Sequence, residues 1–275
     1  MLPVPTRRLN DGIDIPQLGL GTGPMDDADA EVSVSAALDL GYRLLDTASS
    51  YGNEVGIGRG VERSGVERSD VFVTTKLRGS DQGYDETYEG LDASLKRLDL
   101  DYVDLYLIHW PLPRVNKYVD SWRAMIKLRE EGLIRSIGVS NFTEEQILRL
   151  EQETGVLPSV NQIELHPSFA QEHQREVDSR LDIATESWSP LRRGGSLSDP
   201  LFARIATRHQ VTVTQVVLRW HIQLGAIPIP ATSTIEHQRT NLDVFSFSLS
   251  DDEMASIATI DEERIGGDPT SWEEF

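Results

Sequence analysis

Short apolar runs recur along the chain and alternate with stretches of helical character. Many of these runs are apolar on both faces, as in Leu105-Tyr106-Leu107-Ile108, which is typical of parallel strands buried on both sides. Eight successive strand–helix repeats predict a (β/α)₈ TIM barrel, an α/β fold. The expected strands cover residues 18–22, 43–47, 72–76, 103–109, 135–139, 159–165, 182–187 and 225–230.

Helical periodicity places the intervening helices at residues 28–40, 53–63, 84–98, 118–131, 143–153, 170–180, 199–208 and 235–242. Two further helical stretches, 212–223 and 251–260, fall outside the eight repeats and predict two extra helices. Residues 7–15 predict a β-hairpin that turns at Asn10-Asp11-Gly12 and caps the bottom of the barrel. Because no linker or low-complexity segment interrupts this pattern, we expect residues 1–275 to form a single domain.

A doubly wound sheet is the main rival fold, and it would carry a G-x-G-x-x-G turn after its first strand. The run Gly19-Leu20-Gly21-Thr22-Gly23 superficially matches that turn, but its third glycine is misplaced. The glycines also lie within the expected strand, and a polar stretch follows them. The run therefore gives the rival fold little support.

Charge and composition exclude several functional classes. The 26 basic and 45 acidic residues give a formal net charge of −19, which opposes binding to nucleic acid. No apolar run approaches the length of a membrane span, and the N-terminus does not resemble a signal peptide, so we expect a cytoplasmic protein without a membrane partner. Cysteine is absent and the histidines show no zinc spacing, so we expect no metal site.

Four polar side chains lie at or just beyond the ends of three successive expected strands. Asp46 ends the second strand, Lys76 the third and His109 the fourth, while Tyr51 closely follows the second. Catalytic residues of a TIM barrel cluster at these ends, so we expect the four side chains to share one mouth. Singly, each residue has an ordinary structural explanation, such as a helix cap or a solvated lysine. Together they favour a catalytic site.

This set of side chains suits the reduction of a small-molecule carbonyl compound, which needs a hydride at carbon and a proton at oxygen. A free tyrosine, with a pKa of about 10, is already a possible acid. The Lys76 ammonium is expected to lower the pKa of Tyr51 toward the working pH, and Asp46 can hold Lys76 by an ion pair. His109 can donate a hydrogen bond that orients and polarises the carbonyl group.

These residues lie in runs that resemble the aldo-keto reductase family over almost the whole chain, from about residue 7 to residue 260. The matching runs are Leu45-Asp46-Thr47-Ala48, Tyr51-Gly52-Asn53-Glu54, Thr74-Thr75-Lys76, Asp104-Leu105-Tyr106-Leu107-Ile108-His109-Trp110-Pro111, Ile137-Gly138-Val139-Ser140-Asn141-Phe142 and Asn161-Gln162-Ile163-Glu164-Leu165-His166-Pro167. Within the family, the chain looks most like the short bacterial enzymes of the 2,5-diketogluconate reductase type. The resemblance implies that Tyr51 is the acid, that Lys76 and Asp46 form a pair and that His109 orients the substrate. It also implies a monomer that binds NADPH or NADH without a Rossmann domain.

The resemblance also implies how the cofactor is held. Ser140, Asn141 and Gln162 would bind the carboxamide, and Trp188 would stack on the nicotinamide, although ordinary core packing is the alternative for Trp188. The segment 192–195, with two arginines and two glycines, is either a pyrophosphate clamp or an ordinary surface loop. The expected contacts before this segment are Asp46, Ser140, Asn141, Gln162, Trp188, Ser189 and Leu191.

The segment after the eighth strand departs from the family pattern. Members often place a lysine and later an arginine there to bind the 2′-phosphate of NADPH, whereas this chain has Ala231 and His237. Losing fixed cations should weaken phosphate binding, so we hypothesise a reduced preference for NADPH together with real use of NADH. The remaining candidate contacts in this segment are Thr232, Ser233, His237 and Asn241.

The expected substrate contacts depart from the pattern as well. Gly23 stands where the family often has an aromatic residue, and Arg78 stands where a tryptophan often follows the catalytic lysine. Trp110 is retained beside Tyr51 and His109. The pocket should therefore be roomy, with a possible cationic wall that tolerates dicarbonyl compounds or keto acids.

Two other functions stay open at this stage. A cofactor-binding regulator with little turnover would be expected to lack a member of the catalytic set, and none is missing. A phosphate-binding isomerase would carry a glycine-rich phosphate loop after strands seven and eight, and that signal is weak here. Whether the tail around Trp272 folds over the mouth is also open.

Overall fold

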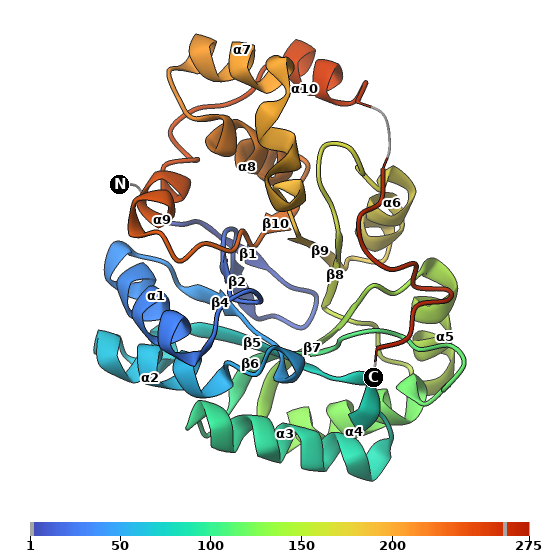
Figure 1. Ribbon diagram of the computed structural model, residues 1–275. Coiled ribbons are helices and arrows are strands. Elements are labelled where there is room, and N and C mark those ends of the chain that lie inside the picture. The colour runs from blue at the N-terminus through green and yellow to red at the C-terminus, as the bar shows by residue number, and fades with distance from the viewer. Residues whose placement is uncertain (1–2, 261–262, 275) are drawn as a thin grey trace.

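Eight parallel strands form the centre of the protein, seen in a computed structural model that describes residues 3–260 and 263–274 (Figure 1). Neighbours in the sheet follow one another in the chain, and the two outer strands come together where Gly19 N donates to Pro228 O and Gly21 N to Pro230 O, both at 3.1 Å. All eight expected strands are confirmed. They are β3 (Leu20–Gly21), β4 (Leu44–Asp46), β5 (Phe72–Leu77), β6 (Val103–Ile108), β7 (Ile134–Ser140), β8 (Val160–Glu164), β9 (Ala184–Trp188) and β10 (Ile227–Pro228).

Helices surround these strands (Figure 1). Thr143 forms a capping box with Gln146 at the start of α5, which shows how local polar residues set a helix start. The helices are α1 (Asp27–Leu40), α2 (Glu54–Ser64), α3 (Tyr84–Leu98), α4 (Tyr118–Glu130), α5 (Glu144–Thr154), α6 (Glu172–Arg180), α7 (Pro200–His209), α8 (Val213–Gln223), α9 (Ile235–Leu242) and α10 (Asp251–Ile257). Short 3₁₀ segments are η1 (Ser49–Tyr51), η2 (Arg68–Asp70), η3 (Gly79–Asp81) and η4 (Arg192–Ser198).

One helix assignment differs from the sequence prediction. Stretch 199–208 was expected to be one of the eight barrel helices, with 212–223 as an extra. In the structure α8 contacts β10, whereas α7 packs on α8 and lies farther from the strands (Figure 1). The extra helix in this region is therefore α7. Both helices bury an apolar face in one shared cluster, which includes Phe202 and Trp220, so periodicity alone could not tell them apart.

The predicted hairpin is present and closes the bottom of the barrel. Strands β1 (Thr6–Arg8) and β2 (Asp14–Pro16) pair antiparallel, and Gly12 adopts the left-handed φ of 88° that the turn requires. Leu9 and Ile15 pack into the same buried cluster as Leu44 and Leu105 from inside the barrel.

Residues two apart in a strand point to the same face, so inward-facing side chains are separated by their height along the barrel, apolar at the bottom and polar at the open end. In β4, Leu44 joins the apolar cluster at the bottom, while Asp46, two residues later, faces the open end. In β9, Ala184 belongs to the same cluster and Trp188 lines the open end. Polar groups therefore gather at the carboxyl ends of the strands, on the side opposite the hairpin.

Candidate active site

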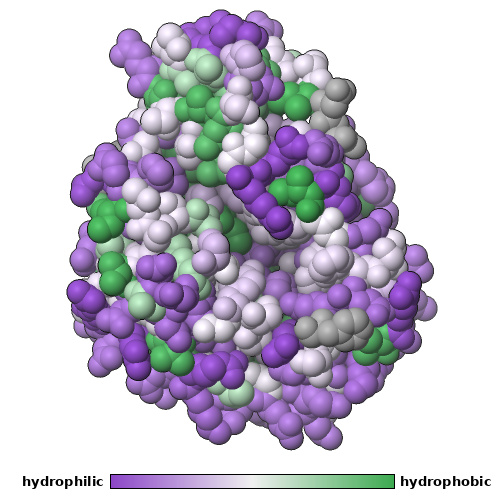
Figure 2. All heavy atoms as spheres, in the orientation of Figure 1, coloured by the Kyte–Doolittle hydropathy of each residue, from purple (hydrophilic) through white to green (hydrophobic). Residues whose placement is uncertain are grey.

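A cavity of about 1010 Å³ opens at the carboxyl ends of the strands. Its volume lies near the upper end of the ~300–1000 Å³ that is usual for ligand pockets. The face drawn in Figure 2 is hollowed near its centre. The cavity brings together most of the residues that the sequence predicted for the site: Gly23, Asp46, Tyr51, His109, Trp110, Ser140, Asn141, Gln162, Trp188, Ser189 and Leu191.

Lys76 lies beneath the cavity floor at the end of β5. Its side chain is fully buried, with Nζ 2.6 Å from Asp46 Oδ1, 2.9 Å from Thr47 O and 3.5 Å from the Tyr51 hydroxyl oxygen. Burial disfavours the ammonium, but Asp46, Tyr51 and Glu186 together outweigh it and raise the pKa of Lys76 above its ordinary value. The lysine is therefore a fixed positive charge next to the tyrosine.

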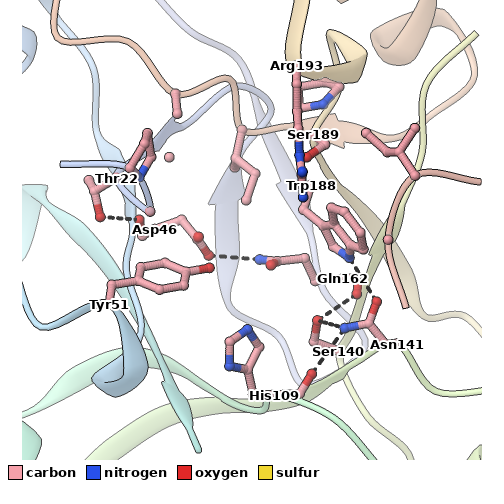
Figure 3. Close-up of a pocket in the computed structure, with 18 of the residues that line it drawn as sticks. Thr22, Asp46, Tyr51, His109, Ser140, Asn141, Gln162, Trp188, Ser189 and Arg193 are labelled. Carbon is pink, nitrogen blue, oxygen red and sulfur yellow. Dashed lines mark hydrogen bonds between the residues drawn. The ribbon is translucent and has the colours of Figure 1, made fainter. Parts of the chain in front are cut away.

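Tyr51 is held over Lys76 by the turn that follows β4. Tyr51 N donates to Ala48 O at 3.0 Å, and Gly52 leaves the turn with a left-handed φ of 71°. The phenol points toward Asp46 in Figure 3. Burial raises the pKa of Tyr51, Lys76 acts to lower it and Asp46 raises it again. The predicted effect of Lys76 is present but does not prevail, so the hydroxyl group keeps its proton at neutral pH.

His109 follows β6, and its ring lies edge-on to Tyr51 with the centroids 5.9 Å apart. His109 Nδ1 is 2.7 Å from Glu274 Oε1 and 3.4 Å from Ser50 Oγ. A carboxylate only accepts hydrogen bonds, so Glu274 fixes a proton on Nδ1. Burial acts to raise the pKa of the Glu274 carboxyl group. Its hydrogen bonds with His109 and with the backbone N–H of Gly79 outweigh burial and hold that pKa below the ordinary value.

The C-terminal tail folds over the mouth of the cavity, which answers the question that the sequence left open. Trp272 packs against Trp110 with ring centroids 5.7 Å apart, and Glu274 lines the cavity. Upstream in the tail, the backbone N–H groups of Ile265 and Gly266 donate to Glu164 at 2.6 and 2.8 Å. Sequence reasoning missed Glu274 because no pattern links the tail to His109.

Ser140, Asn141 and Trp188 form one wall of the cavity (Figure 3). Trp188 Nε1 donates to Asn141 Oδ1 at 2.8 Å, and Asn141 Nδ2 donates to His109 O at 3.1 Å. Ser140 Oγ donates to Gln162 O at 2.8 Å. These bonds fix polar groups beside an indole ring, an arrangement that could bind a planar amide-bearing ring.

A buried acid that sequence reasoning missed lies below this wall. Glu186 Oε2 accepts from Gln162 Nε2 at 2.6 Å, and the same nitrogen donates to Asp46 Oδ2 at 2.7 Å. The signal that could have found Glu186 is strand alternation, since it stands two residues before Trp188 on the inner side of β9.

Cationic groups near the cavity are few. Arg193 is exposed and lines the cavity, so it remains available for a phosphate, whereas Arg192 pairs with Glu263. Arg78 is half-buried immediately before η3 and is not among the described residues that line the cavity. A cationic wall made by Arg78 is therefore not seen in this structure.

The segment after β10 lies outside the cavity beyond Ala231. Thr232 is partly exposed, Ser233 and His237 are exposed, and Asn241 is buried next to Tyr42. These residues could contact only a part of a ligand that extends out of the cavity.

Gly23 leaves room beside the phenol, since a Cβ added there would lie 3.5 Å from the Tyr51 ring. In the part of the chain that the structure describes, no cluster of three His, Cys, Asp or Glu side chains is arranged to hold a metal ion. Across the described residues, no helix is both long and apolar enough to cross a membrane.

Comparisons with known proteins place the chain among related sequences and structures. The family model described as "Aldo/keto reductase family" matches residues 16–262. An aldo-keto reductase from Mycolicibacterium smegmatis is 51% identical over 269 residues, which cover 98% of both chains. A 2,5-diketo-D-gluconic acid reductase B from Corynebacterium sp. is 48% identical over 274 residues, covering 99% of both chains. The crystal structure of a Gox0644 mutant in complex with NADPH is 42% identical, with a TM-score of 0.95, and covers 99% of this chain and 100% of that chain.

Proposed function

Because the chain belongs to the aldo/keto reductase family, we propose that it reduces aldehydes and ketones to alcohols with a nicotinamide cofactor. The observation that carries the proposal is the contact set around Tyr51: a protonated phenol 3.5 Å from the Lys76 ammonium at the floor of a large cavity. A phenol in this position can donate a proton to an oxygen that binds beside it. The proposal keeps the expectation of a monomeric cytoplasmic enzyme.

In the proposed reaction, Tyr51 gives its proton to the carbonyl oxygen as that oxygen gains negative charge. Lys76, held by Asp46, stabilises the phenolate that remains. His109, whose ring lies edge-on to the phenol, orients the substrate oxygen. A reduced nicotinamide, when bound, supplies the hydride to the carbonyl carbon.

The residues present fit such a cofactor. Trp188 offers a ring face, and Ser140 and Asn141 offer polar groups beside it. Gln162 presents the oxygen of its amide to the cavity, because its nitrogen is occupied by Asp46 and Glu186. Arg193 could contact a pyrophosphate group at the edge.

We further propose that NADH is used as well as NADPH. The Gox0644 structure contains NADPH, which favours the phosphorylated cofactor. The surroundings of His237 argue against a strong preference for NADPH. The only charged pair near His237 in the described chain is Arg239 with Glu236, 3.8 Å apart, and the Glu236 carboxylate would repel a phosphate. The ratio of kcat/KM with NADPH to that with NADH tests this. A ratio above about one hundred, or an unchanged ratio in Ala231→Lys, would contradict it.

As substrates we propose small dicarbonyl compounds, since a 48% identical relative is named a 2,5-diketo-D-gluconic acid reductase. The sequence favoured keto acids as well. Glu274 argues for neutral dicarbonyl compounds over acids, including the acid in the name of that relative, because its carboxylate lies on the cavity wall beside His109.

The experiment that tests the function follows nicotinamide absorbance with a panel of carbonyl compounds, using wild type and Tyr51→Phe. We expect turnover in wild type and a loss of at least a hundredfold in the variant, which keeps the ring but removes the proton. Equal rates in both would reject Tyr51 as the acid. Cofactor binding without turnover in wild type would instead favour the regulatory alternative.

A further inference from the structure

Glu186 is a buried acid for which the proposed reaction has no use. It lies in the middle of β9 with no measurable exposure. Its Oε2 accepts from Gln162 Nε2 at 2.6 Å, while its Oε1 has no hydrogen-bond partner among the described residues. Burying an acid at the floor of a site is costly, so its presence there calls for a role.

The first consequence of Glu186 concerns the orientation of Gln162. The amide nitrogen carries two protons, and two acceptors lie within reach: Asp46 Oδ2 at 2.7 Å and Glu186 Oε2 at 2.6 Å. With both acceptors on one side, the amide can satisfy them only by turning its nitrogen toward them. Its carbonyl oxygen then faces the cavity that Gln162 lines (Figure 3).

The second consequence concerns Asp46. Gln162 holds Asp46 Oδ2, which leaves Oδ1 for Lys76 at 2.6 Å. Lys76 in turn lies 3.5 Å from the Tyr51 hydroxyl oxygen. Glu186 is therefore one end of a continuous chain of contacts that reaches the proton donor.

The charges around Glu186 favour its neutral form. Asp46 from β4, Lys76 from β5 and Gln162 from β8 face it, while Ile227 of β10, its partner in the sheet, is apolar. Burial, followed by repulsion from Asp46, raises the pKa of Glu186 to about 8, against the opposing effects of Gln162 and Lys76. With a single ammonium nearby, Asp46 takes the negative charge and Glu186 keeps a proton. Because Oε2 accepts from Gln162, that proton sits on Oε1.

We propose that Glu186 is a positioning residue which, as a neutral carboxylic acid, turns the carbonyl oxygen of Gln162 toward the cavity, where it accepts a hydrogen bond from the carboxamide of the nicotinamide. The inference rests on the proposed function, because it requires a nicotinamide ligand. When Glu186 ionises at alkaline pH, its negative charge makes proton donation by Tyr51 harder, so reduction slows.

The binding test compares NADP⁺ with its 3-acetylpyridine analogue, whose methyl ketone cannot donate the hydrogen bond that a carboxamide donates. We expect wild type to prefer NADP⁺ by about two- to tenfold, the effect of one hydrogen bond. Glu186→Leu should bring this ratio close to one, whereas Glu186→Gln, which keeps an acceptor for Gln162, should retain it within about twofold. Adenosine 2′,5′-bisphosphate, which lacks the nicotinamide, should bind all variants equally.

Asp178→Asn is the matched control. Asp178 is also buried and its pKa is also raised, to about 6 and mainly by burial, but its partners are Asn161, Gln174 and Thr185, away from the cavity. The Asp178→Asn variant should keep the wild-type preference for NADP⁺ over the 3-acetylpyridine analogue. If Glu186→Leu does not fold, the pH profile still tests the idea: reduction by wild type should decline with an inflection near pH 8 that Glu186→Gln lacks.

The outcomes separate this inference from the proposed function. Turnover and NADP⁺ binding in wild type, with an unchanged ratio in Glu186→Leu, would overturn the role of Glu186 alone. An inflection near pH 8 that persists in Glu186→Gln would do the same. Failure of wild type to bind NADP⁺ or to reduce any carbonyl compound would overturn the function and the inference together.

Discussion

Glu274 should select substrates by charge, and replacing it with glutamine tests this directly. Its carboxylate lies 2.7 Å from His109, and its side chain is only 16% exposed, so water screens it weakly. The Glu274→Gln change removes the negative charge while keeping the size of the side chain and an oxygen that can accept from Gly79 N. We expect kcat/KM to rise for anionic carbonyl compounds and to change little for neutral ones.

The size of the gain follows from Coulomb's law. A carboxylate on a substrate whose carbonyl oxygen lies beside His109 would come within roughly 6 Å of the Glu274 carboxylate. At an effective dielectric constant of about 20 to 40, two unit charges at that separation repel by about 1.4 to 2.8 kcal/mol. That repulsion corresponds to about 10- to 100-fold in kcat/KM.

The assay compares pyruvate with methylglyoxal, which are similar in size and differ in charge. The quantity of interest is the pyruvate-to-methylglyoxal ratio of kcat/KM, because intrinsic differences in reactivity cancel between variants. Glu273→Gln is the control, since it removes the same charge from the adjacent tail residue, which lies 3.4 Å from Arg114 and does not line the cavity. An equal change for both substrates in Glu274→Gln would refute the reasoning and leave Glu274 only the role of holding His109.

Two further predictions concern stability. A Cβ at Gly58 in α2 would lie 2.0 Å from the carbonyl oxygen of Leu98, so Gly58→Ala should lower the free energy of unfolding in denaturant titrations by about 1–3 kcal/mol or more, and an unchanged midpoint would show that the backbone yields freely. His221 Nε2 donates to Pro190 O and Nδ1 of the neutral ring accepts from Ser187 Oγ, both at 3.1 Å, and burial lowers the pKa of His221 from 6.5 to about 3. The unfolded chain therefore binds this proton first, so the free energy of unfolding should fall as the pH drops from about 6.5 toward 3, with a shallower fall in His221→Gln measured by the same titrations.

Much of the fold could be predicted because the chain repeats one local pattern. Continuous apolar runs such as Leu105–Ile108 are typical of strands covered on both faces, and eight of them with helices between leave few alternatives to a barrel. The positions of Asp46, Lys76 and His109 followed from the same logic, since barrel geometry brings strand ends to one mouth. A site built on regular elements is thus visible in sequence.

The parts that sequence could not predict depend on contacts without a local period. Glu274 meets His109 from 165 residues farther along the chain, and nothing in the tail specifies where it lands. Arg78 was expected to face the substrate from its spacing after Lys76, but the turn into η3 directs it away from the cavity lining. Glu186 could have been predicted to lie inside the barrel, because strand alternation places it there. Its role, however, depends on Gln162 and Asp46, which only the three-dimensional structure brings together.

The balance of charges around Tyr51 also bears on the direction of the proposed reaction. Burial, to which the charges of Asp46 and Glu274 add and which the Lys76 ammonium opposes, holds the pKa of Tyr51 above its ordinary value. A phenol in that state is a competent acid throughout the neutral range, whereas alcohol oxidation would need the phenolate as a base. If Lys76 alone had set the pKa of Tyr51, that pKa would be lowered, and the rates of carbonyl reduction and alcohol oxidation would be more nearly equal. Burial and the neighbouring acids therefore bias the site toward carbonyl reduction, and oxidation should become measurable only as the pH rises.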